Sequence, residues 1–172
     1  MIILYDLGLI LVAIILQTTL AEFVSDLMGA KPDLVLILVV SFGLLRGKRA
    51  GIGYGWLLGL LQDGLSGSLL GQNALSKGLI GFLAGHLRRS LGDFTTVTQL
   101  LFVPLATLFD AAIHVGTAAL LYGTPAGKGA LGTLGLAVLL NTGIAPVVSW
   151  MVRAGLRRVE GAWENPPAGK PR

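Results

Sequence analysis

Residues 32–61 read PDLVLILVVSFGLLRGKRAGIGYGWLLGLL, two apolar runs separated by three basic residues. A membrane helix needs about 20 mostly apolar residues, with some latitude for short or tilted helices. One long helix, or a re-entrant hairpin, would put Arg46, Lys48 and Arg49 deep in lipid, at roughly 2.5–3.5 kcal/mol each. Two short helices let these side chains reach the membrane surface. We therefore expect two separate spans, at residues 32–45 and 50–61.

Four further apolar runs predict spans at residues 2–23, 73–85, 97–122 and 131–152. Hydrophobic residues make up 53% of the 172 residues and charged residues only 13%, whereas a soluble domain carries roughly 25% charged residues. This composition excludes a soluble globule, a disordered chain and a coiled coil. The sequence predicts an all-α integral membrane protein: a six-helix transmembrane domain at residues 1–152, then a cytoplasmic, largely disordered tail at residues 153–172.

Lys and Arg are distributed unevenly over the loops that six spans create. Ten of them lie on the side of the two termini and two, Lys31 and Lys128, on the other, while Lys77 lies within a span. That other side also carries four acidic residues: Glu22, Asp26, Asp33 and Asp63. Because cytoplasmic loops carry an excess of Lys and Arg, we expect both termini in the cytoplasm.

The loops and motifs also exclude several functions. No connection is much longer than a dozen residues, so we expect no extramembrane domain for a nucleotide, metal or sugar. The sequence has no cysteine and no Walker-type, HExxH or paired CxxC motif. We attribute the net charge of +4 to the excess of Lys and Arg in the expected cytoplasmic loops rather than to nucleic-acid binding. We expect no enzyme activity, no cofactor and no metal.

Two of the expected spans carry glycines at four-residue spacing. They are Gly51, Gly55 and Gly59 in the span at 50–61, and Gly81 and Gly85 in the span at 73–85. Asp63 lies four residues after Gly59, and Lys77 lies four residues before Gly81, so each shares the helix face of its glycines. Such strips let another helix approach closely. We interpret them as internal packing of the bundle, with a seam to a partner as the alternative.

Asp110 and His114 lie four residues apart in the span at 97–122 and therefore share one helix face. Ionisable groups at that depth need partners and face the bundle interior or a water-filled cavity. They form either a hydrogen-bonded pair that locks helix register, or a proton relay or polar ligand site faced by Asn141 or Gln17.

Three segments together resemble the rod-shape-determining protein MreD family. They are Pro32-Asp33-Leu34-Val35-Leu36, then Gly55-Trp56-Leu57-Leu58-Gly59-Leu60-Leu61-Gln62-Asp63, then Gly71. The family has a PDL-type helix start, a G-x-x-x-G-L-x-x-D run and a loop with a further glycine. The resemblance covers about residues 32–85. The positions that match are Pro32, Asp33, Gly55, Gly59, Asp63 and Gly71.

The resemblance implies a non-enzymatic scaffold of the bacterial cell-elongation machinery, which directs peptidoglycan synthesis at the inner membrane. Its expected partners are the membrane helix of MreC, the RodA–penicillin-binding protein pair and MreB. The implied fold is similar to the six-helix substrate-binding subunits of energy-coupling-factor transporters. That similarity leaves an alternative function, a subunit that captures a vitamin-type small molecule in a pocket lined by Lys77, Asp110, His114 and Asn141.

Overall fold

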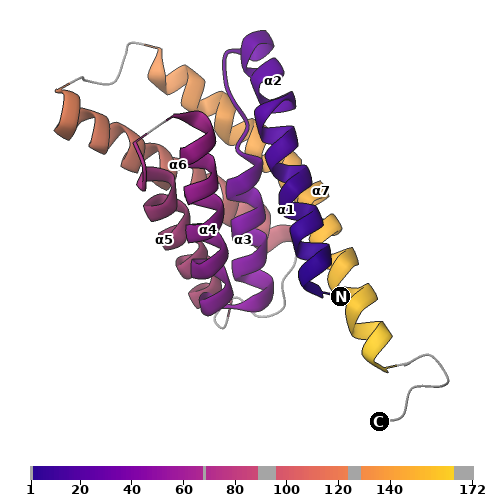
Figure 1. The fold of residues 1–172 in the computed structure, drawn as a ribbon. Helices are drawn as coiled ribbons and strands as arrows, with labels where there is room; N and C mark the ends of the chain where they lie inside the picture. The colour runs from indigo at the N-terminus through magenta and orange to yellow at the C-terminus, as the bar shows by residue number, and fades with distance from the viewer. Residues whose placement is uncertain (1, 68, 89–95, 124–128, 165–172) are drawn as a thin grey trace.

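The computed structural model describes residues 2–67, 69–88, 96–123 and 129–164, and these residues form seven helices (Figure 1). They are α1 (Ile2–Thr18), α2 (Leu20–Met28), α3 (Leu34–Arg46), α4 (Lys48–Ser66), α5 (Gln72–Leu87), α6 (Thr96–Tyr122) and α7 (Ala130–Glu164). Helical hydrogen bonding continues across Thr19, whose amide donates to Ile15 O at 3.0 Å. α1 and α2 are therefore one nearly continuous helical stretch.

The helices run alternately between two ends of the molecule, named here by their place in Figure 1. At the upper end, α2, α4 and α6 finish and α3, α5 and α7 start; α1 starts and α7 finishes toward the lower end. Charge differs between these ends. The lower end carries Arg46, Lys48, Arg49 and Arg88, and the upper end carries Glu22, Asp26, Lys31, Asp33 and Asp63.

Three helical stretches of the described chain are long and apolar enough to cross a membrane: Tyr5–Met28, Val97–Tyr122 and Ala130–Gly155. A further apolar helix, Leu34–Arg46, is shorter than these three. These stretches include three of the six predicted spans almost completely, and the shorter helix corresponds to a fourth.

The short apolar helix α3 lies at the centre of the bundle. Every residue from Leu34 to Leu44 is buried, and α3 contacts α1, α4, α5, α6 and α7. A helix that is apolar all round has no preferred outward face and is stable only when it is covered on all sides. The core lies on both sides of α3: one cluster joins it to α5, α6 and α7, the other to α1, α4 and α7.

Several helices continue beyond the apolar runs that predicted them. α2 extends to Met28 and ends where Gly29 adopts φ 75°, while α4 extends to Ser66 and ends where Gly67 adopts φ 61°. A left-handed glycine is a common helix terminator, and hydropathy alone does not detect it. α7 continues to Glu164, well past residue 153, where the tail is predicted to begin. Residues 165–172 of that tail lie outside the described residues.

Candidate functional site

The three glycines of α4 that lie four residues apart face α5 at backbone contact distance. A Cβ at Gly51 would lie 2.1 Å from Gly81 O, and one at Gly55 would lie 2.2 Å from Lys77 O. At Gly59 the nearest atom is Ala74 Cα, at 2.4 Å. Any side chain on these positions would therefore push the two helices apart.

The strip continues at the lower end and into α3. A Cβ at Gly85 would lie 2.3 Å from Lys48 N, and one at Gly43 of α3 would lie 2.7 Å from Gly81 O. Gly43 was not predicted as part of the strip; the glycine four residues after it, Gly47, lies just beyond the end of α3. The structure thus places all five predicted packing glycines in contacts within this chain.

Asp63 closes the turn between α4 and α5. Its carboxylate accepts hydrogen bonds from Gly71 N at 2.8 Å, Asn73 N at 3.0 Å and Asn73 Nδ2 at 2.8 Å. Free amides at a helix start are satisfied in this way, and charge-assisted bonds of this kind are strong. Gly71 itself has φ 96°, a conformation that glycine adopts at little cost. Asp63 and Gly71, two of the positions that match the family pattern, therefore both stabilise the turn between α4 and α5.

Lys77 of α5 is 0% exposed and joins three helices. Its Nζ lies 2.9 Å from Asp33 Oδ2 at the start of α3 and 3.5 Å from Asp110 Oδ1 in α6. It also donates to Asn73 Oδ1 at 2.7 Å. A buried ammonium needs compensating partners of this kind, because its desolvation is costly.

Asp110 and His114 share a face of α6, as the spacing predicts. The Asp110 carboxylate accepts a hydrogen bond from Ser76 Oγ and pairs with Lys77. His114 Nδ1 lies 2.9 Å from the Asp110 backbone oxygen and 3.6 Å from its Oδ2. The pair is thus part of a larger network centred on the buried lysine.

Gln17 and Asn141, which one of the two alternatives placed facing Asp110 and His114, form hydrogen bonds at the start of α3. Gln17 Oε1 accepts from Leu34 N at 2.7 Å and its Nε2 donates to Pro32 O at 3.1 Å. Asn141 Oδ1 accepts from Asp33 N at 2.7 Å. Both side chains thereby satisfy the backbone at the start of α3, where amides have no partner within the helix. Asn141 Nδ2 donates in addition to Thr107 Oγ1 of α6 at 3.0 Å. Within the described residues, neither side chain hydrogen-bonds to Asp110 or His114.

The lower end holds a second polar cluster that the sequence reasoning missed. Asp6 of α1 is 3% exposed and accepts two hydrogen bonds from the Arg46 guanidinium, that from Nη2 at 2.7 Å. Tyr54 of α4 donates to Asp6 Oδ2 at 2.7 Å, and its ring stacks on Phe42 at 4.3 Å between centroids. Asp6 is an acidic residue within an apolar run, which was the available signal.

Together these contacts can hold helices at a set rotation and depth. The upper network joins α3, α5 and α6 through ion pairs, and the lower cluster joins α1, α3 and α4. Among the residues that the structure describes, no group of three or more His, Cys, Asp or Glu side chains is arranged to hold a metal ion.

Comparison with known proteins identifies the family. The family model described as rod shape-determining protein MreD matches residues 2–124, which is well over half of the chain and more than the resemblance at residues 32–85 covers. No curated protein and no solved structure matches. The transport-subunit alternative gains no support from these comparisons. The long apolar helices agree with a membrane protein. The chain therefore belongs to the MreD family, membrane proteins with a role in determining rod shape.

Proposed function

We propose that this protein is a non-enzymatic scaffold of the cell-elongation machinery that binds the membrane helix of MreC and so helps to position the cell-wall synthases. The observation that carries the proposal is the location of the polar groups. Outside the helices, the described residues form only short connections such as residues 29–33, and the charged networks join helices of this chain. The surface left for a partner is therefore the apolar side of the helices.

The proposed topology has six spans in the bacterial inner membrane with both termini in the cytoplasm, in a fold like that of energy-coupling-factor substrate-binding subunits. The alternating helix directions in Figure 1 support it. So does the charge difference between the ends, because basic residues favour the cytoplasmic side. Under this proposal the lower end is cytoplasmic, and MreC links the protein to the RodA–penicillin-binding protein pair and to MreB.

The docking surface differs from the glycine strip of α4. That strip is already occupied by α5, so a partner helix cannot reach it without separating the two. Three glycines of α7, Gly132, Gly135 and Gly143, lie on its exposed side. A Cβ at any of them would have no heavy atom of the described residues within 4 Å. Small exposed residues let a second helix approach closely, so α7 is the face to test first.

The experiment is co-purification of the full chain with full-length MreC in detergent. We expect the wild type to capture MreC, and Gly135→Leu and Gly143→Leu to reduce capture. The matched control is Gly8→Leu on α1, another exposed glycine whose added Cβ meets nothing in the described structure. Thermal unfolding of each variant shows that the fold is intact. Equal capture of MreC by all variants would show that these glycines of α7 are not the docking surface. Failure of the wild type to capture MreC would refute the proposal.

A further inference from the structure

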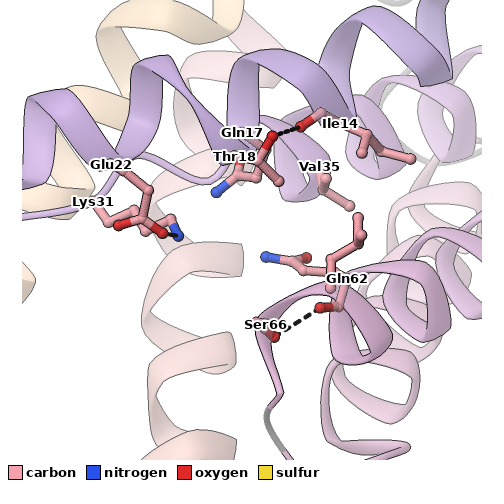
Figure 2. A pocket seen from close by; sticks show the side chains of 9 residues that line it. Ile14, Gln17, Thr18, Glu22, Lys31, Val35, Gln62 and Ser66 are labelled. Atoms are coloured by element: carbon pink, nitrogen blue, oxygen red, sulfur yellow. Dashed lines mark hydrogen bonds and ion pairs between the residues drawn. The ribbon is translucent and has the colours of Figure 1, made fainter.

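A pocket of about 200 Å³ lies at the upper end of the molecule, between the α1–α2 stretch and α4 (Figure 2). Ile14 and Val35 form part of its apolar wall, and Glu22, Lys31, Gln62 and Ser66 supply polar groups. The same two helical stretches are joined at the lower end, where Tyr54 donates to Asp6 at 2.7 Å. The α1–α2 stretch and α4 are thus in contact at the lower end and lie apart at the upper end, where the pocket is.

Two opposite charges lie on one side of this pocket. Lys31 donates to the Glu22 carboxylate, and their side chains are 37% and 56% exposed. An exposed ion pair contributes little stability, so each partner can turn to a ligand charge at small cost. A ligand that itself carries one positive and one negative group would match both.

Gln62 adds an unsatisfied polar group on the other side. Its Oε1 is buried and has no hydrogen-bond partner within the described part of the chain, whereas buried polar atoms almost always have one. Figure 2 shows its amide nitrogen directed into the pocket. Because the terminal torsion of glutamine is broad and roughly two-fold, the side chain can present either amide atom to a ligand.

We propose that this pocket binds the headgroup of a phospholipid that carries both a phosphate and a primary ammonium, as in phosphatidylethanolamine. The phosphate accepts a hydrogen bond from Lys31 Nζ. The ammonium donates to the Glu22 carboxylate and to Gln62 Oε1, the acceptor that has no partner in the described residues. The lipid comes from the leaflet at the upper end, since headgroups lie at the ends of membrane helices. Leu65, which lines the pocket and is 59% exposed, offers apolar contact to the attached chain.

The test is lipid retention by the full chain, purified in detergent with equal amounts of three lipids and measured by native mass spectrometry. Phosphatidylcholine keeps the positive charge without an N–H donor, and phosphatidylglycerol lacks the cation. We expect phosphatidylethanolamine to be retained roughly tenfold better than either, the effect of one charge-assisted hydrogen bond. Glycerophosphoethanolamine, which has the headgroup without acyl chains, should compete poorly.

Two variants and their controls locate the site. Glu22→Gln removes the anionic partner, with Asp26→Asn, an exposed acid of α2 outside the pocket, as its control. Ser66→Trp fills the pocket, with Gly64→Trp, exposed on the same helix, as its control. We expect both pocket variants to lose the preference and both controls to keep it. Equal retention of the three lipids, equal loss in the controls, or full competition by the chain-free headgroup would each overturn the proposal.

Discussion

Replacing Gly55 by alanine tests whether α4 and α5 are held together by direct backbone contact. The new methyl would lie 2.2 Å from Lys77 O and 2.8 Å from Gly78 Cα, whereas ordinary van der Waals contact starts at 3.4 Å. Both neighbours are backbone atoms and cannot rotate away. α5 must therefore retreat by about 1 Å, and a gap of that size forfeits a quarter to a half of each dispersion contact along the strip.

The expected free-energy change combines two opposing effects. Overpacking of this kind costs about 1–3 kcal/mol, and the lost contacts at Gly51 and Gly59 add to it. Replacing a helical glycine by alanine recovers about 0.5–1 kcal/mol of backbone entropy. We expect a net loss of about 2 kcal/mol. Gly53→Ala on the same helix, where a Cβ would meet no described heavy atom within 4 Å, should instead gain about 0.5–1 kcal/mol.

The assay is thermal unfolding in detergent, followed by tryptophan fluorescence. Trp56 reports on the interface directly, because its Cδ1 lies 2.4 Å from where a Cβ on Gly78 would be. At about 2–4 °C per kcal/mol for a chain of this size, the two variants should differ in Tm by roughly 5–12 °C. If Gly55→Ala unfolds at the same temperature as Gly53→Ala or above it, α4 and α5 are not in backbone contact and the reasoning fails.

Two further predictions concern the polar clusters. Lys77→Met should destabilise the protein by about 3–5 kcal/mol, because Asp33 and Asp110 lose their shared cation. Adding Asp110→Asn to that variant should restore part of the lost stability. If the two substitutions have strictly additive effects on the free energy of unfolding in a double-mutant cycle, the ion pair is refuted. Arg46→Lys keeps the charge but loses the two parallel N–H bonds to Asp6, so the amides of α1 should exchange with deuterium faster than in the wild type. Unchanged exchange would show that Arg46 does not anchor α1.

Local periodicity predicted correctly which residues share a helix face. Gly51, Gly55 and Gly59 share a face because residues four apart lie above one another on a helix, and the structure places all three against α5. The same rule put Asp110 beside His114. The helical ends were less predictable, because hydropathy marks the apolar part of a helix and not the glycine that terminates it.

Sequence alone determined that the chain is helical and strongly apolar, and which residues share a helix face, since these depend on composition and on a repeat within one helix. Tertiary structure decided that Lys77 pairs with Asp33 and Asp110, that Gln17 serves the start of α3, and that α3 lies at the centre. Such pairings depend on the rotation and depth of one helix relative to another. Packing of the whole bundle sets both, and the repeat of a single helix does not encode either.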